Sequence, residues 1–416
     1  METPESRINT NSNRNAKKGY IMEKGIGVLE LVDRLRRCAY IEKMSIKHLS
    51  GWFIAAPTYE YKHTFGYHAW NHAEHVDWIL NRLELLRGGH SGANVDPLLE
   101  QWLSVFLDAP NQYAFIRGSY LVLKKSLLDF YRETLERCDT AANALDVHLI
   151  KRIIPEIQEQ IKWANGVLEQ DPDPKTSAKW EQSLKEALSD MGGILVRTVH
   201  ASGETQTFKL RKPFLLPNEI IFDDRIQNKP ITPHEQKLKM SFEDAVVEQF
   251  RVFFNEVYAA AMAATIIFES FDKNIPWGFI RDITRQFWDE TRHSQFGDIR
   301  LKELGLKPDR CNQTLFKYSL AMPLVNRLCY LTMMLEPHFM PRKKPRFNEY
   351  MEAGDVRSML FADHDWSDEI NHVKHGKFWL DELLKDDARD IDVLKEETQK
   401  IIDRIEGKHV DEMSPF

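Results

Sequence analysis

A pattern of metal-binding residue types occurs twice in this chain. The sequence D-E-x-x-H-x-x-x-G-x-x-x-L-x-E-L runs from Asp289 to Leu304 and again from Asp368 to Leu383. It contains two Glu-x-x-His pairs, Glu290 with His293 and Glu369 with His372. A glutamate and a histidine three positions apart lie on the same face of a helix, so each pair can converge on one point. Two such helices facing each other would supply half of a dinuclear metal site.

Two isolated glutamates are candidates for the other half of the site. A dinuclear site of this kind needs one further carboxylate from each of two more helices. Glu256 and Glu336 are each the only charged residue in a long apolar stretch, and they precede Glu290 and Glu369 by 34 and 33 residues. A carboxylate buried alone among apolar residues costs several kcal/mol unless a cation or hydrogen-bond donors meet it. A metal ion would meet that need for all four glutamates.

A single Glu-x-x-His is weak evidence, and the repeat is what makes this one informative. A third Glu-x-x-His, Glu406 with His409, is interrupted by Gly407 and lacks a matching carboxylate helix, so we interpret it as part of the tail. An internal duplication of two amphipathic helices with surface carboxylates would explain the repeat without a metal. That alternative leaves Glu256 and Glu336 unexplained.

Composition is that of an ordinary soluble globular protein. The 416 residues are 43% hydrophobic and 29% charged, with a net charge of -7 that argues against nucleic acid as the main partner. The four cysteines are scattered and form no C-x-x-C. The polar N-terminus lacks the apolar core of a secretory signal, and no unbroken apolar run reaches the roughly 18 residues of a membrane span. We therefore expect a cytoplasmic protein without a membrane partner.

Helical periodicity predicts an all-α fold with two bundles. Residues 1–20 are expected to be a disordered tail, and the first bundle covers 27–168. Its helices are predicted at 28–52, 64–86, 97–137 (either continuous or broken) and 146–168. This bundle holds a looser group of metal-binding residue types, which are Glu42, His72, Glu74 and His75. It is either a degenerate duplicate that has lost its metal and serves as scaffold or interface, which we favour, or the location of a second site.

Residues 169–240 are predicted to be a linker. The turn-rich DPDPKTS begins it, and an alternating stretch around Ser202-Gly203 predicts a β-hairpin insert. The second bundle follows at 241–385, with helices at 241–270, 276–305, 314–339 and 355–384, and residues 386–416 form a C-terminal helix or tail. Gly297 and Gly376, one turn beyond each histidine, would let helices approach closely near the site.

Residues 241–385 resemble the ferritin-like di-iron carboxylate superfamily. Its members share the order Glu, Glu-x-x-His, Glu, Glu-x-x-His on four helices, and many of its oxygenases carry the D-E-x-x-H form. The resemblance implies a ligand set of Glu256, Glu290 and His293 nearer one metal and Glu336, Glu369 and His372 nearer the other, with some glutamates bridging. It also implies that Asp289 and Asp368 accept the free ring N–H of a ligand histidine. Pro337 departs from the pattern: it disfavours helical geometry at Glu336, so either the helix ends or kinks there or Glu336 is not a ligand.

Carboxylate and imidazole ligands without thiolate suit iron or manganese better than a structural zinc. The leading hypothesis is an O₂-dependent non-haem di-iron oxidase or monooxygenase acting on a small organic substrate. Its cofactors would be two Fe, or Mn, or a mixed Fe/Mn pair, with electrons from an external donor or from the substrate itself. The alternatives are a ferroxidase or iron-handling protein and a non-catalytic interaction protein. The N-terminal bundle offers a surface for a homodimer.

Overall fold

The computed structural model describes residues 24–89, 97–194, 214–273 and 275–407. Over these ranges the fold is all-α, as predicted, and apart from the helices it has one isolated bridge between Gln227 and Arg310 and no strand. The predicted β-hairpin and the predicted N-terminal tail fall on segments outside the described residues.

The N-terminal half is built on three long helices and a set of shorter ones. These are α1 (Val28–Ala55), α2 (Tyr59–Glu84), α3 (Pro97–Val105), η1 (Phe106–Asp108), α4 (Gln112–Ile116), the π-helical segment η2 (Arg117–Lys124), α5 (Lys125–Arg137), α6 (Ala144–Leu168) and α7 (Pro174–Asp190).

The C-terminal half follows a connection that contains the short helix α8. Its elements are α8 (His234–Lys237), α9 (Phe242–Asn255), α10 (Val257–Ser270), α11 (Trp277–Glu303), α12 (Thr314–Leu320), α13 (Leu324–Cys329), the π-helical η3 (Tyr330–Leu335), α14 (Glu336–Phe339), η4 (Met340–Arg342), α15 (Lys343–Glu352), α16 (Val356–Leu383) and α17 (Ile391–Ile405).

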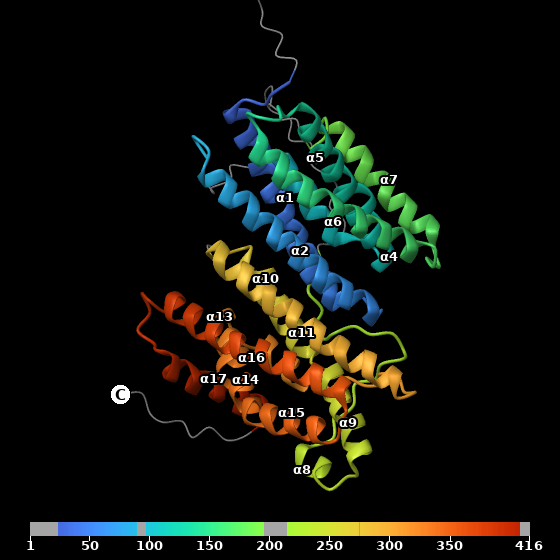
Figure 1. The fold of residues 1–416 in the computed structure, drawn as a ribbon, viewed down its shortest axis with the longest axis vertical. Coiled ribbons are helices and arrows are strands. Elements are labelled where there is room, and N and C mark those ends of the chain that lie inside the picture. Colours follow the sequence, from blue (N-terminus) through green and yellow to red (C-terminus); the bar gives the residue numbers. More distant parts are fainter. Residues whose placement is uncertain (1–23, 90–96, 195–213, 274, 408–416) are drawn as a thin grey trace, which may run out of the picture.

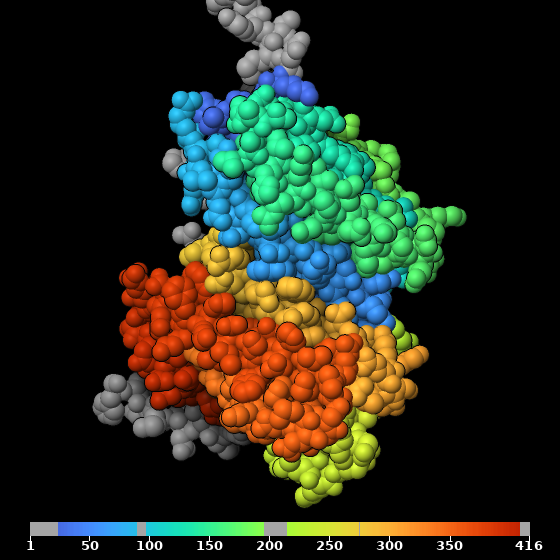
Figure 2. Space-filling model, viewed as in Figure 1, coloured from blue at the N-terminus to red at the C-terminus, as the bar shows by residue number. Residues whose placement is uncertain are grey.

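Helix pairs stack in layers along the length of the molecule (Figure 1). The α1/α2 hairpin packs on α6 on one side and on α10 and α11 on the other. Helix α6 in turn packs on α5, and α11 packs on α16. Figure 2 shows the two halves in contact along α2 (blue) and the yellow-to-orange helices α10 and α11. Helix α10 is apolar all round and almost wholly buried, as its central position requires.

Within the described residues, one helical stretch, Phe242–Ser270, is long and apolar enough to cross a membrane by length and composition. In its most apolar window, 78% of the residues are buried inside the protein. This stretch is α9 and α10, which supply core residues of the C-terminal half.

Three features differ from the sequence expectations. Helix α7 lies within the predicted linker, because Asp173 caps it and Pro174 starts it, which are helix-initiating residues rather than a turn. Pro323 starts α13 and separates it from α12, so the helix predicted at 314–339 is in several pieces. Helix α15 was not predicted at all.

Candidate metal centre

The six predicted ligand residues lie together in the C-terminal half. Glu256 is at the junction of α9 and α10, Glu290 and His293 are on α11, and Glu336 begins α14. Glu369 and His372 are on α16. All are buried except Glu256, which is partly buried. Two groups of potential ligands result, Glu256, His293, Asp365 and Glu369, and Glu290, Glu336, Glu369 and His372, with the donor atoms of each group within 4.8 Å of one another.

The first group surrounds Nδ1 of His293. This atom lies 3.2 Å from Oε2 of Glu256, 3.6 Å from Oδ1 of Asp365 and 4.0 Å from Oε1 of Glu369. Two ligands each about 2.1 Å from one ion, at a right angle, are about 3 Å apart. The spacing therefore suits donors that share an ion.

The second group surrounds Nδ1 of His372. This atom is 3.3 Å from Oε1 of Glu290 and 3.5 Å from Oε1 of Glu336. The other oxygen of Glu290 lies 3.6 Å from Nδ1 of His293, so this carboxylate reaches both groups, as Glu369 also does. The resemblance implied that Glu290 sits nearer the His293 metal, but the structure puts it between the two positions.

The remaining nitrogen of each histidine faces an aspartate of the opposite helix. Nε2 of His293 lies 3.2 Å from Asp368, and Nε2 of His372 lies 3.5 Å from Asp289. Arg292 joins both aspartates, donating over 2.7 Å to Asp289 and 2.6 Å to Asp368. The Nδ1 atoms are consequently the ones turned toward the carboxylates, which is the orientation a metal ligand needs.

The backbone is irregular at both carboxylate helices. Glu256 is a turn residue whose N–H bonds the carbonyl of Phe253, three residues back. Glu336 follows the π-helical segment η3 and keeps helical angles, with φ -56° and ψ -51°, in spite of Pro337. The helix expected to end or kink at Glu336 is instead widened just before it, and Glu336 stays in the site. Such π segments are frequent at functional sites.

Buried donor atoms without hydrogen-bond partners converge here. Among the described residues the site contributes Nδ1 of His293 and His372 and one oxygen each of Glu256, Glu290, Glu336 and Asp365. Unpaired Nδ1 of His293 lies 3.2 Å from unpaired Oε2 of Glu256, and unpaired Nδ1 of His372 lies 3.3 Å from unpaired Oε1 of Glu290, yet neither pair has hydrogen-bond geometry. Unpaired buried polar atoms are rare in folded proteins, and a metal ion would satisfy all of them. The residues therefore fit a dinuclear metal.

The pKa shifts show how the charges are balanced. Burial raises the pKa of Glu336, and the charge of Glu290 adds to that, giving about 7. Burial alone would lower the pKa of both histidines. The hydrogen bond with Asp368 raises the pKa of His293 well above the ordinary value, and the charge of Glu336 with the hydrogen bond to Asp289 does the same for His372. Metal binding to such a site must displace protons from the imidazoles.

Asp365 was missed by the sequence reasoning, although a signal for it exists. It precedes Glu369 by four residues and is fully buried on the same face of α16. The equivalent position of the first repeat is Gln286, which donates over 2.9 Å to Glu336, so the comparison of repeats concealed the aspartate. Lys343, also missed, lies 2.6 Å from Asp365 and 3.2 Å from Glu369.

The N-terminal candidates are only partly brought together. Glu42, His72 and His75 form a buried group, and Glu74 is not part of it. Glu42 is hydrogen-bonded to His72, to His75 at 3.2 Å and to Tyr131 at 2.9 Å. Burial would lower the pKa of His75, but Glu42 outweighs it and raises the pKa to about 9. Because Glu42 is already satisfied, this group has less need of a metal, and the scaffold interpretation stays our prediction.

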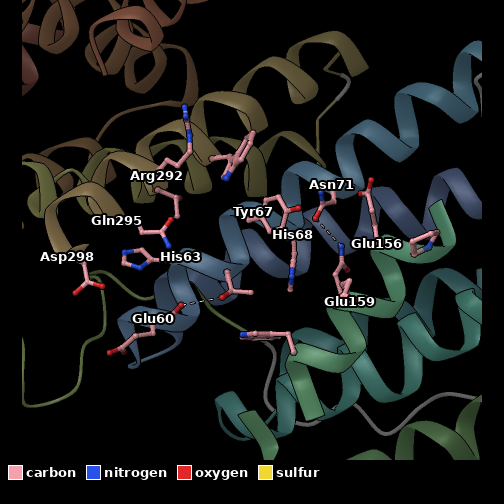
Figure 3. Close-up of a pocket in the computed structure, with 16 residues that line it drawn as sticks. Glu60, His63, Tyr67, His68, Asn71, Glu156, Glu159, Arg292, Gln295 and Asp298 are labelled. Atoms are coloured by element: carbon pink, nitrogen blue, oxygen red, sulfur yellow. Dashed lines mark hydrogen bonds between the residues drawn. The ribbon is translucent and has the colours of Figure 1, made fainter. Parts of the chain in front are cut away.

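Two cavities flank α11. One of about 260 Å³ reaches Glu256, Glu290, Glu336 and Glu369. The other, of about 670 Å³, lies between α2, α6 and α11 on the far side of that helix. Figure 3 shows it lined by Tyr67 and His68 of α2 and by Arg292 and Gln295 of α11. None of the six predicted ligands lines this larger cavity, so the smaller one is the candidate substrate site.

Comparison with protein-family models, with curated proteins and with solved structures finds no match to this chain.

Proposed function

We propose that the C-terminal half is a ferritin-like four-helix bundle that holds two iron ions, and that the protein is an O₂-dependent oxidase or monooxygenase of a small organic substrate. The observation that carries this proposal is the grouping of buried carboxylate and imidazole atoms, several of them unpaired, from the α9/α10 junction, α11, α14 and α16. Oxygen and nitrogen donors without thiolate favour iron or manganese.

The roles of the residues follow from their positions. Glu256, His293 and Asp365 would hold one ion, and Glu336 and His372 the other, with Glu290 and Glu369 between them. Two reduced iron ions held by these residues would supply electrons to O₂. Asp289 and Asp368 keep each imidazole turned inward. The buried apolar residues of α10 keep bulk water out of the site.

The test is anaerobic loading with Fe²⁺, followed by metal analysis and by O₂ uptake on exposure to air. We expect two ions per chain and rapid O₂ consumption. Glu290→Ala and Glu369→Ala should each lose metal at both positions, since these carboxylates lie between them. Glu382→Ala is the matched control because Glu382 is exposed on α16 and belongs to the same repeat.

Less than one ion per chain would contradict the proposal and favour a non-catalytic interaction protein. Many turnovers with Fe²⁺ alone and growth of an iron mineral would favour a ferroxidase instead. Electrons for the proposed reaction come from an external donor or from the substrate.

A further inference from the structure

The cavity at the candidate metal centre has a positively charged entrance. Besides the four glutamates, its lining includes His234 and Lys237 of α8, Arg342 of η4 and Arg346 of α15. A neighbouring cavity of about 420 Å³ is lined by the same four residues, so they lie between it and the metal centre. Figure 1 places α8 and α15 beside α9 at one end of the C-terminal half.

The cations of this entrance lack carboxylate partners. Within the described parts of the chain, Arg342 and Arg346 form no ion pair, and they lie over the rings of Phe339 and Phe253 at 5.6 Å each. Lys237 donates over 2.7 Å to the neutral Gln249. Lys343, in contrast, is already paired with Asp365. One carboxylate, Glu349, lines the neighbouring cavity of about 420 Å³, so the entrance keeps an excess of positive charge.

The pKa shifts of the entrance residues agree with an excess of positive charge there. Burial and the charges of Arg346 and Arg342 lower the pKa of Lys237 to about 8, although Glu248 acts in the opposite direction. Burial, Arg342 and Lys237 also lower the pKa of His234. Like charges held together in a half-buried place repel one another, and an anion placed among them would relieve that repulsion.

Besides the charged entrance residues and the glutamates, the cavity also has apolar lining residues. Its lining includes Val252, Leu315, Leu331, Leu335 and Phe339. A ligand that fills it would therefore have an apolar body and a charged end. Two guanidinium groups favour a planar or tetrahedral oxyanion, which accepts paired hydrogen bonds from Arg.

We propose that this cavity binds a small amphipathic anion, a carboxylate or phosphate monoester, with its charged group at Lys237, Arg342 and Arg346 and its apolar part toward the metal centre. That this anion is the substrate rests on the proposed oxidase function, whereas its binding does not.

The experiment is calorimetric titration of the full-length protein, before metal loading, with octanoate, octyl phosphate and 1-octanol. We expect one or both anions to bind and the alcohol to bind about tenfold or more weakly, the scale of a lost charge-assisted hydrogen bond. Whichever anion binds more tightly identifies the headgroup. Equal affinity for octanol and octanoate would overturn the proposal.

Two variants locate the site. Arg342→Gln and Arg346→Gln should each weaken anion binding about tenfold. Lys344→Gln removes the same charge from the exposed neighbouring position of α15, which does not line the cavity, and should leave affinity unchanged. Equal losses in all three variants would indicate a general charge effect and contradict the site.

Proton uptake gives a second readout that needs no arginine variant. At about pH 8 about half of the Lys237 side chains are neutral, and an anion beside them should restore their charge. Titrations in buffers of different ionisation enthalpy should show uptake, and Lys237→Met should abolish it. Uptake that persists in Lys237→Met would contradict the assignment of the headgroup site.

Measurement of O₂ uptake by the Fe²⁺-loaded protein distinguishes the anion site from the oxidase proposal. Anion binding without O₂ uptake would leave the anion site standing and remove the oxidase. Uptake of O₂ stimulated equally by octanoate and octanol would keep the oxidase and remove the anionic substrate.

Discussion

In the candidate centre, Nε2 of each histidine is hydrogen-bonded to an aspartate of the facing helix. Because Asp368 orients His293 and Asp289 orients His372, the two Glu-x-x-His pairs are coupled across the site rather than independent. Burial would raise the pKa of Asp289, but hydrogen bonds with His372 and Arg285 lower it to about 2, so Asp289 stays charged at neutral pH.

Removing this support should weaken metal binding without removing a ligand. We expect Asp289→Asn and Asp368→Asn to lower Fe²⁺ affinity about 10- to 100-fold, as measured by competition with a chelator. Asp363→Asn, on the exposed face of α16, is the control. Unchanged affinity in the first two variants would mean that the aspartates do not orient the ligands.

Asp365 makes the two groups of potential ligands unequal. It adds a carboxylate to the group of Glu256 and His293, while the equivalent residue Gln286 gives the other group a neutral hydrogen-bond donor. We expect Asp365→Asn to lose the ion beside His293 first, so that metal analysis falls from two ions per chain toward one. Loss of both ions together, or of neither, would contradict this unequal assignment.

At the scale of the helices, two glycines permit the close contacts around the site. A Cβ at Gly297 would lie 2.2 Å from the backbone nitrogen of Phe254, and one at Gly376 would lie 2.2 Å from the side chain of Thr332. Each contact joins a Glu-x-x-His helix to the segment that carries an isolated glutamate. The sequence prediction of close approach at these glycines is thereby confirmed.

Gly297→Ala should therefore destabilise the protein by about 1–3 kcal/mol or more, since the clash is with backbone. Gly166→Ala is the matched control: nothing lies within 4 Å of its added Cβ, so we expect it to stabilise α6 by about 0.4–1 kcal/mol. Chemical denaturation measures both. Equal stability of the two variants would show that α9 and α11 shift apart without cost.

The end of α1 is held by a buried lysine of α2. Nζ of Lys62 donates over 2.5 Å to the carbonyl of Phe53, one of the last carbonyls of α1, and burial lowers the pKa of Lys62 from 10.5 to about 7. Between these values the unfolded chain binds the extra proton, so the stability of the folded protein rises as pH rises from about 7 to about 10.5.

Lys62→Met should flatten that part of the profile of unfolding free energy against pH. Lys239→Met, which replaces an exposed lysine, should leave the profile as it is. The same slope in wild type and Lys62→Met would assign the pH dependence to another group.

At the scale of the whole molecule, α10 and α11 are shared between the two halves. One face of α11 carries Glu290 and His293, while the other meets α1 and α2, where the rings of Phe53 and Phe287 are in edge contact at 4.8 Å. A Cβ at Gly66 of α2 would lie 2.5 Å from Thr291, which shows how closely the helices pack. The helices that form the site thus also form the junction.

A fragment of residues 214–407 should therefore not fold by itself, because the buried α1/α2 face of α10 and α11 would meet water. We expect aggregation or loss of a cooperative thermal transition, followed by circular dichroism and size-exclusion chromatography. The full chain should unfold in one transition. A monomeric, cooperatively folding fragment would contradict this expectation and restore two independent bundles.

The residue types and their local spacing were sufficient to predict the all-α fold and the six residues that gather at the site. Helical periodicity and a lone carboxylate in an apolar stretch are local properties of the sequence, so they can be recognised without knowing how the helices pack. The repeat added the pairing of distant helices, because two equivalent segments are expected to face each other.

Tertiary structure alone decided what depends on the register between helices. The inclusion of Asp365, the sharing of Glu290 and Glu369, and the crossed contacts of Asp289 and Asp368 follow from how α11 and α16 are offset along their axes. The charged entrance likewise combines α8 with the consecutive elements η4 and α15, which come about 100 residues later in the chain. No sequence spacing encodes these contacts, because they are set by packing energy summed over many side chains.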